Sequence, residues 1–268
     1  MKIVVCIKQV PDTADISWTE NNTMKREGME AILNPFDEFA LETAFKIKDK
    51  FQDTHITVIT MGPPQAKEIL KQAIAKGADE AILLSDKKFA GADTFSTSKT
   101  LAKAIKKLVP DFNLIICGQF ATDGDTGQTG SAISTHLDIP CTTFVKEISE
   151  IKENCISILK QTETTLVSLN ITLPALICII KTDYALRPAL INGYIKAHSL
   201  EIKTYSAEDI ELNQEETGMK GSPTYVCKAF RPDVKRQCNI LTLNTAEEAV
   251  LFLDKKIKEL KERYSLNE

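Results

Sequence analysis

The strongest constraint on the fold is an alternation of apolar runs with helix-like segments along the first 145 residues. The apolar runs read KIVVCIKQV, HITVITM, AILLS and NLIICG, and helical patterns follow them at 35–50, 64–76, 94–108 and 127–137. Each run is apolar throughout instead of at every second residue, as in strands that are covered on both faces. The alternation therefore predicts an α/β fold, with a parallel sheet at its core and helices on both faces.

Two segments depart from this rhythm. Between residues 10 and 34 lies a polar stretch that is long for a connection in such a unit, and we expect a hairpin there with its turn at Glu20-Asn21-Asn22. After residue 145 the runs CISILKQ, TTLVSLNITL and ALICIIK follow one another without a helix between them. This succession predicts an antiparallel addition to the sheet.

The C-terminal part has a different character. Beyond Asp183 the periodicity is lost, and a helical pattern returns only at 245–263. Aromatic residues are spread along this stretch, which a flexible linker would not need, although a linker remains the alternative. We therefore expect two parts: an α/β domain at 1–182, and an extended C-terminal arm with a terminal helix at 183–268 that wraps a partner subunit.

Composition excludes several classes of protein. The 268 residues include 33 basic and 37 acidic side chains, for a formal net charge of -4, and no basic block of the kind that follows a phosphate backbone. Nucleic acid is therefore not an expected partner. No stretch approaches the roughly 20 apolar residues of a membrane span. The start MKIVVCIKQVPD lacks a signal-peptide pattern, so we expect a cytoplasmic protein.

The reactive side chains form no recognisable catalytic or metal pattern. The seven cysteines are widely spaced, with no C-x-x-C pair, and three of them lie in apolar runs, where a thiol acts as a small hydrophobe. The three histidines are scattered, without a neighbouring nucleophile. We expect reduced cysteines, no metal and no catalytic side chain.

The stretch CGQFATDGDTGQTG, residues 117–130, combines glycines, hydroxyls and acidic residues after a buried run and before a helix. Ligands of open parallel sheets bind at the carboxyl ends of the strands, where helix N-termini attract anions. Its last three glycines recur at every third position and allow close backbone approach, while Thr126 and Thr129 offer hydroxyls to phosphate oxygens. A phosphate cradle for a nucleotide is one interpretation, and a capping turn without a ligand is the other.

Neither common phosphate motif is present in this stretch. No Lys-Ser/Thr pair follows as in a Walker loop, and the dinucleotide G-x-G-x-x-G pattern would belong after the first strand. Asp123 and Asp125 argue against a bare phosphate pocket, because carboxylates better fit helix capping, ribose hydroxyls or an adenine amino group. Similar turns at 8–12, 61–65 and 91–98 follow other predicted strands, so together they predict an extended pocket on one rim of the sheet.

Six motifs lie in order along nearly the whole chain: VCIKQVPDT, NPFDEFALETA, TMGPPQA, FAGADTFSTS, CGQFATDGDTGQTG and GMKGSPTYVCKAF. Together they resemble the beta subunit of electron transfer flavoproteins. GADT-x-x-TS and DGDT-x-Q resemble most closely the electron-bifurcating branch, whose beta subunit holds FAD where the other branch holds AMP. The resemblance implies a Rossmann-like fold of the adenine nucleotide alpha hydrolase type.

The resemblance also implies which residues bind the cofactor. In that family the nucleotide lies along the first two strand ends, the segment 34–37 and the glycine-rich stretch, and the GADT turn approaches the rest of a bound FAD. The positions so implied are Cys6, Asn34, Pro35, Phe36, Asp37, Met61, Ala92, Asp93, Thr94, Thr97, Gly118, Gln119, Phe120, Ala121, Thr122, Asp123, Gly124, Asp125, Thr126, Gly127, Gln128 and Thr129.

Other positions are implied to face a second polypeptide. Thr13 and Phe36 match positions that reach the flavin of the alpha subunit. The stretch 187–197 resembles the loop that docks a partner dehydrogenase, with Ile191 as an apolar anchor. The docking positions so implied are Arg187, Leu190, Ile191 and Gly193.

The chain departs from the family at Gly118-Gln119-Phe120, where relatives usually read Gly-Lys/Arg-Gln. The missing cation removes a charge partner for phosphate or for reduced flavin. We therefore expect the tuning of the flavin to differ from that of other members, with the nucleotide site itself retained.

The function that the resemblance implies is electron transfer. A bifurcating beta subunit would take a hydride from NADH onto its FAD. One electron would pass through the alpha-subunit FAD to a dehydrogenase for acyl-CoA thioesters or 2-hydroxy acids such as lactate, and the other to ferredoxin or flavodoxin. Two alternatives remain, which are a beta subunit with structural AMP and a free-standing nucleotide-binding protein. The identity of the bound cofactor would separate the FAD-binding bifurcating subunit from the subunit with AMP. Stable folding without a partner would favour the free-standing protein.

Overall fold

The structure is a computed structural model that describes residues 1–12, 31–227, 240–243 and 245–264. Contacts divide the chain into two units, Met1–Ala229 and Phe230–Glu268. The expected hairpin turn at residues 20–22 lies outside the described residues. In the part of the chain that is described, no helix has the length and apolar character needed to cross a bilayer.

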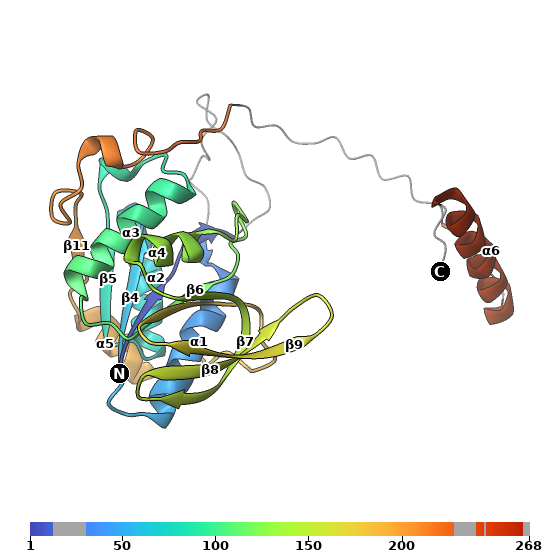
Figure 1. Cartoon of the computed structure of the whole chain (residues 1–268), viewed down its shortest axis with the longest axis horizontal. Helices are drawn as coiled ribbons and strands as arrows, with labels where there is room; N and C mark the ends of the chain where they lie inside the picture. Colours follow the sequence, from blue (N-terminus) through green and yellow to red (C-terminus); the bar gives the residue numbers. More distant parts are fainter. Residues whose placement is uncertain (13–30, 228–239, 244, 265–268) are drawn as a thin grey trace. The chain divides into compact units, whose positions relative to one another are not determined.

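A twisted sheet forms the centre of the first unit (Figure 1). Among the described residues its strand order is β11-β5-β4-β1-β6-β10-β7-β8-β9. The parallel part consists of β1 (Lys2–Cys6), β4 (His55–Met61), β5 (Glu80–Leu84), β6 (Leu114–Gly118), β10 (Ala175–Ile179) and β11 (Lys203–Tyr205). β7 (Cys141–Lys152) is parallel to β10 on one side, and on its other side β8 (Cys155–Gln161) and β9 (Leu166–Thr172) follow in antiparallel order. A separate two-stranded ribbon joins β2 (Gln9–Pro11) to β3 (Ala31–Leu33).

Helices cover both faces of the sheet, as the alternation predicted. The helices and helical turns of the first unit are α1 (Pro35–Lys50), η1 (Pro64–Ala66), α2 (Lys67–Lys76), η2 (Lys87–Phe89), α3 (Thr94–Leu108), α4 (Thr129–Leu137), α5 (Ile191–Ser199) and η3 (Gln214–Glu216). Side chains of α1 and α2 pack with one buried cluster, and side chains of α3 and α4 pack with the other. The α/β fold class is therefore confirmed.

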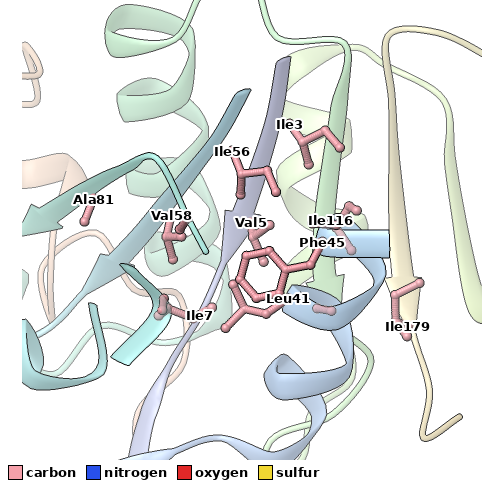
Figure 2. Packing of buried hydrophobic residues seen from close by; sticks show 14 of the residues in the cluster. Ile3, Val5, Ile7, Leu41, Phe45, Ile56, Val58, Ala81, Ile116 and Ile179 are labelled. Carbon is pink, nitrogen blue, oxygen red and sulfur yellow. The ribbon is translucent and has the colours of Figure 1, made fainter. Parts of the chain in front are cut away.

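Alternate residues of each central strand enter the two clusters, because successive side chains of a strand point to opposite faces. On the α1 side Ile3 and Val5 of β1 lie near Phe45 of α1, which is 1% exposed (Figure 2). On the α3 side Val4 of β1 belongs to the cluster that contains Ile105. Burial on both faces explains why these strands are apolar at every position.

One strand assignment from the sequence is wrong. The run ALICIIK was expected to join an antiparallel addition, but β10 lies between β6 and β7 and is parallel to both. All five of its residues are buried, so its sequence carries the same continuous apolar signal as the core strands. The antiparallel addition consists of β8 and β9 hydrogen-bonded in succession to β7.

Residues 184–227 belong to the same unit as the α/β sheet. β11 pairs with β5 at one edge of the sheet, and α5 packs on α2. The short elements and many turns of these residues explain why no periodicity was visible. The helix predicted at 245–263 is present in the second unit as α6 (Ala246–Tyr264). That this part of the chain wraps a partner subunit stays a prediction.

Candidate functional site

The turns that follow β1, β4, β5 and β6 lie along one edge of the sheet. The strands are parallel, with Cys6 opposite Ile59 and Cys117, and Met61 opposite Leu84, so their carboxyl ends are level. The expectation that the four turns share one rim is therefore confirmed. We call this edge the nucleotide rim.

Asp37 fixes two of the turns to each other. Its two carboxylate oxygens accept from the backbone N–H of Lys8 at 2.7 Å and from that of Gly118 at 3.2 Å. Burial raises the pKa of Asp37 to about 7, although these N–H donors and Asn34 act in the opposite direction. A side chain at position 118 would place its Cβ 2.3 Å from the Asp37 carboxylate, so glycine is required there. Asp37 thus positions the rim from within.

Asn34 and Lys8 hold the start of the glycine-rich loop. The Asn34 side chain donates to the carbonyl of Phe120 at 2.8 Å and accepts from the N–H of Thr122 at 3.4 Å. The Lys8 ammonium pairs at 2.7 Å with Asp123, whose side chain is only 5% exposed. The sequence placed Lys8 in the turn after the first strand but assigned this side chain no role.

Gln119, where the family resemblance led us to expect a cation in relatives, is buried and bonded within the chain. Its Oε1 accepts from the N–H of Phe144 at 2.8 Å, and its Nε2 donates to the carbonyl of Gly127 at 3.3 Å. The neighbouring ring of Phe120 packs edge-on between Phe36 at 5.5 Å and Phe144 at 5.8 Å. Phe144 has a φ of 58° at an irregularity of β7, and no sequence pattern indicated its role.

The N-termini of α3 and α4 at this rim differ. Asp93 caps α3 by accepting from the N–H of Ser96 at 2.9 Å, and it also accepts from the Thr224 hydroxyl at 2.7 Å. The N-terminus of α4 has no side-chain cap, although Asp123 and Asp125 precede it closely. The capping interpretation of the glycine-rich loop is therefore not supported. The free N–H groups of an uncapped helix N-terminus attract anions.

The groups that remain available at the rim are hydroxyls and backbone. Thr94 of the GADT turn donates to the hydroxyl of Thr126 at 3.3 Å, so the two motifs adjoin. Gly124 is exposed, and a Cβ there would meet nothing within 4 Å. Gly130, by contrast, leaves room for the sulfur of Cys178 under α4, because a Cβ would lie 2.4 Å from it. This donor set suits the phosphates and hydroxyls of a nucleotide.

The other positions implied for the cofactor also lie at the rim or directly beneath it. Cys6 is buried, whereas Pro35, Thr122, Asp125, Thr126 and Gln128 are exposed and Phe36, Met61, Ala92, Thr97, Ala121, Gly127 and Thr129 are half-buried. Thr13 lies outside the described residues. Among the described residues no group of three histidine, cysteine or carboxylate side chains could hold a metal ion.

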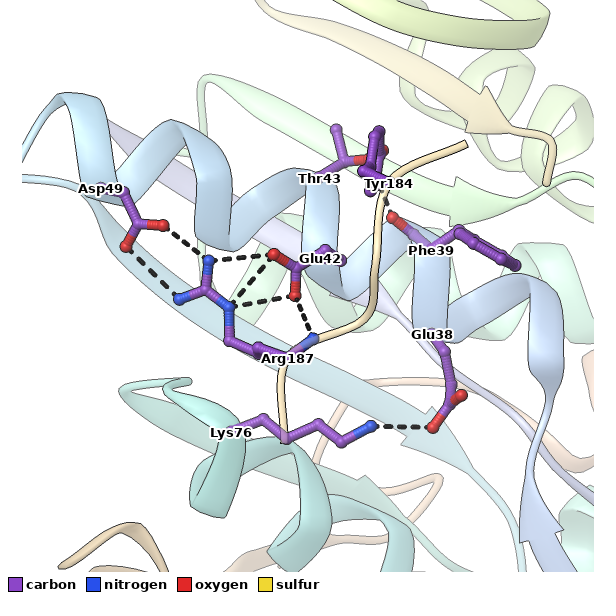
Figure 3. Close-up of polar contacts among 8 residues, drawn as sticks. All are labelled: Glu38, Phe39, Glu42, Thr43, Asp49, Lys76, Tyr184 and Arg187. Atoms are coloured by element: carbon purple, nitrogen blue, oxygen red, sulfur yellow. Dashed lines mark hydrogen bonds and ion pairs between the residues drawn. The ribbon is translucent and has the colours of Figure 1, made fainter. Parts of the chain in front are cut away.

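The segment expected to dock a dehydrogenase is anchored by its polar residue. Figure 3 shows the Arg187 guanidinium between two carboxylates of α1, at 3.0 Å from Glu42 and 2.6 Å from Asp49. Burial lowers the pKa of Arg187, but the two carboxylates raise it to above its ordinary value. Gly193 allows α5 to approach α2, since a Cβ there would lie 2.0 Å from the carbonyl oxygen of Ala75.

The apolar residues of this segment point outward. Leu190 is 69% exposed and Ile191 79% exposed, and Tyr194 and Ile195 of α5 are also exposed. We call Leu190, Ile191, Tyr194 and Ile195 the α5 apolar face. Of the four predicted docking residues, Arg187 and Gly193 therefore have internal roles, and Leu190 and Ile191 are free to contact another molecule.

Comparisons with known proteins agree along nearly the whole chain. The family model described as "Electron transfer flavoprotein domain" matches residues 21–210. An electron transfer flavoprotein subunit beta of Clostridium acetobutylicum is 41% identical over 97% of this chain and 98% of its own length. The caffeyl-CoA reductase-Etf complex subunit CarD of Acetobacterium woodii is 42% identical over 97% and 98%, and Protein FixA of Azotobacter vinelandii is 40% identical over 87% and 84%.

A comparison of structures adds little. A flavoprotein of DNA/pantothenate metabolism from Streptococcus pneumoniae aligns with 64% of this chain and 91% of its own at 9% identity and a TM-score of 0.23. That score is too low to carry an argument.

Proposed function

The chain belongs to the electron transfer flavoproteins, among their beta subunits, and on that premise we propose that it binds FAD at the nucleotide rim and serves electron bifurcation. Membership of this family leaves the free-standing nucleotide-binding protein without support. The CarD and FixA relatives favour the bifurcating branch over one that holds structural AMP.

The observation that carries the proposal is the uncapped N-terminus of α4 next to the paired hydroxyls of Thr94 and Thr126. The N–H groups at the start of α4 would hold the phosphates. The GADT turn at the start of α3 extends the donor set beyond what a mononucleotide needs. A dinucleotide would use the glycine-rich loop and the GADT turn, whereas AMP would need only the glycine-rich loop.

Most polar side chains of the rim would position this site and not contact the ligand. Asp37, Asn34 and Gln119 use their oxygen and nitrogen atoms within the chain. They fix the backbone to which the ligand binds, so it does not reorganise on binding. Lys8, which pairs with Asp123, places a cation at the glycine-rich loop. Gln119 is uncharged and supplies no cation there.

When bound, FAD would accept a hydride from NADH and release the two electrons singly. One electron would go through the alpha subunit to a dehydrogenase for acyl-CoA thioesters or 2-hydroxy acids, and the other to ferredoxin or flavodoxin. The α5 apolar face is the surface that we propose for the dehydrogenase. The chain itself would supply position and electrostatics.

The proposal is tested by placing a fixed charge at the N-terminus of α4. Thr129→Asp would put a carboxylate on the first residue of the helix, where a negative charge stabilises the fold by about 0.3–1 kcal/mol and repels phosphate. Thr129→Asn is the matched neutral control. We expect the Asp variant of the heterodimer with the alpha subunit to fold at least as well as the control and to lose the nucleotide of the beta subunit.

Flavin counting and an activity assay complete the test. We expect two FAD per heterodimer before substitution and NADH-driven reduction of ferredoxin that depends on a dehydrogenase and its acceptor. One FAD together with AMP would show that the AMP alternative is correct. Full retention of the beta-subunit nucleotide in Thr129→Asp would contradict the position of the phosphates.

A further inference from the structure

A segment that the proposed function does not use lies against the GADT turn, residues 91–94. It comprises residues 218–224, the beginning of the motif GMKGSPTYVCKAF, and we call it the strap. The N–H of Met219 donates to the carbonyl of Ala90 at 3.1 Å, directly before the GADT turn. The strap thus packs on one of the two loops that we assign to the nucleotide, although more than 120 residues separate the two in the sequence.

Two glycines allow this close contact. Gly218 is buried, with a φ of 56°, and a Cβ there would lie 2.1 Å from the carbonyl oxygen of Lys88. Gly91 has a φ of 71°, and a Cβ there would lie 3.1 Å from the methyl carbon of Met219. Because such positive φ values favour glycine, both sides of the contact depend on residues that the two motifs supply.

Asp93 joins the strap to α3 through both oxygens of its side chain. Oδ1 accepts from the N–H of Ser96 at 2.9 Å and so caps α3. Oδ2 accepts from the N–H of Thr224 at 3.1 Å and from its hydroxyl at 2.7 Å. The N–H of Asp93 donates to the Ser222 hydroxyl at 2.8 Å, which donates in turn to the carbonyl of Gly218 at 2.7 Å. The polar atoms of the Asp93 side chain are therefore used within the chain.

The bonds to Asp93 fix the position of its neighbour Thr94. Thr94 is the first residue of α3, and its hydroxyl donates to that of Thr126 in the glycine-rich loop at 3.3 Å. A change in the backbone at Asp93 would move the hydroxyl that extends the nucleotide rim beyond the glycine-rich loop. Groups that are fixed before a ligand arrives need not be ordered on binding, so a preorganised turn binds more tightly.

We propose that the strap selects FAD over AMP, with Asp93 as a positioning residue that holds the GADT turn ready for the riboflavin phosphate part of FAD. This inference rests on the proposed function, in which the glycine-rich loop holds the phosphates and the GADT turn extends the donor set. Without the bonds between Asp93 and the strap, the α3 cap would remain but the turn would be free to take other conformations. FAD would then bind more weakly, and AMP would not.

The test measures the affinities of AMP and FAD for the beta-subunit site of the heterodimer with the alpha subunit. Radiolabelled AMP is bound at equilibrium to the nucleotide-depleted heterodimer and is displaced by unlabelled AMP or by FAD. Only displaced AMP is counted, so FAD that binds to the alpha subunit does not enter the result. Before substitution we expect FAD to displace the label at a lower concentration than unlabelled AMP does.

Thr224→Val removes the hydroxyl donor to Asp93 and keeps the shape of the side chain, and Thr224→Ser is the matched control that keeps the hydroxyl. Thr224 is exposed, so both variants should fold. We expect Thr224→Val to weaken FAD binding about tenfold, with AMP binding unchanged, because the lost bond is one to a charged group. A merely structural effect would weaken both nucleotides alike. An equal ratio of the two affinities in Thr224→Val and Thr224→Ser would overturn the proposal.

Asp93→Ser separates the two oxygens of Asp93. Serine is as good an N-cap as aspartate, so α3 keeps its cap, but the second oxygen and its bonds to Thr224 are lost. Removal of the negative charge by itself would favour both phosphate-bearing ligands. Weaker binding of FAD alone would therefore support the proposal, and unchanged FAD binding or an equal loss for both nucleotides would contradict it.

Linkage gives an independent readout. If the strap favours FAD, then FAD must stabilise the strap by the same free energy. Amide hydrogen exchange of residues 218–224, followed by mass spectrometry, should be slower with FAD than with AMP, and the difference should shrink in Thr224→Val. Equal exchange with the two nucleotides would overturn the proposal. Failure of FAD to displace AMP from the heterodimer before substitution would instead contradict the proposed function.

Discussion

The nucleotide rim and the α5 segment are both held by internal polar bonds, but they expose groups of opposite character. In both, polar side chains point into the protein and fix a local backbone: Asp37 and Asn34 at the rim, and Arg187 beside α5. At the rim this leaves backbone N–H groups and hydroxyls exposed, which suits a polar small molecule. At α5 it leaves Leu190 and Ile191 exposed, which suits a protein surface.

The comparison shows that a polar residue can belong to a family motif without contacting a ligand. Asp37 and Arg187 were both expected to contact another molecule, and both have their polar atoms bonded within the chain. The residues that remain free are those whose chemistry matches the expected ligand. Four substitutions or measurements test this division of roles, in order of decreasing effect.

The largest effect is expected at the glycines of the rim. Gly118→Ala would force a Cβ to within 2.3 Å of the Asp37 carboxylate and 2.8 Å of the Phe36 backbone. Such overpacking, together with loss of the hydrogen bond from the Gly118 N–H to Asp37, should reduce the free energy of unfolding by about 3 kcal/mol. Gly124→Ala is the control in the same loop, and we expect it to change stability by less than about 0.5 kcal/mol.

Chemical denaturation of both variants measures the difference, and AMP binding by Gly124→Ala adds a second readout. A Cβ at position 124 has free space in the chain alone, so weaker binding there would indicate that the ligand approaches this backbone. Equal stability losses in the two variants would mean that the rim is not as rigid as we conclude.

The second effect is expected from removal of the Arg187 clamp. Arg187→Ala would leave Glu42, only 6% exposed, without its cation, at a cost of about 1–3 kcal/mol. Lys203→Ala is the control, because its pair with Glu80 is exposed and should contribute less than about 1 kcal/mol. Denaturation curves give the stabilities, and the Arg187→Ala/Glu42→Gln double variant should recover part of the loss.

The third effect concerns pH. The folded-state pKa of Asp37 is raised from 3.8 to about 7, so the folded chain holds a proton that the unfolded chain has lost. The contribution of this proton to the free energy of unfolding is present at low pH and is lost as pH rises through about 7. The loss amounts to about 1 kcal/mol between pH 6 and pH 8. Asp37→Asn should lack this slope, and unfolding measured at several pH values in both proteins isolates it.

The smallest effect on stability is expected at the α5 apolar face. Ile191→Ser changes a side chain that is 79% exposed, so stability should shift by less than about 0.5 kcal/mol. If this face docks the dehydrogenase, the KM for electron transfer to it should rise about tenfold. Phe51→Ser, at 45% exposure and near the amino ends of the strands, is the control that should leave KM unchanged.

Sequence alone determined the layers of this protein and the identity of its rim. Continuous apolar runs report burial on two faces, and parallel strands bring every strand end to one edge, so the four turns had to converge. Helix bounds at 35–50 and 94–108 followed from periodicity and caps, and the structure has the same bounds. These features depend on local pattern and on one rule of sheet geometry.

Tertiary structure alone decided the order of β10 and the roles of single residues. A strand that is apolar throughout reveals burial but not its neighbours, so β10 could not be placed between β6 and β7 beforehand. Asp37, Gln119 and Arg187 each bond a partner that lies 25 or more residues away along the chain: Lys8, Phe144 and Glu42. Whether a polar atom is free for a ligand depends on such distant partners, which no local pattern encodes.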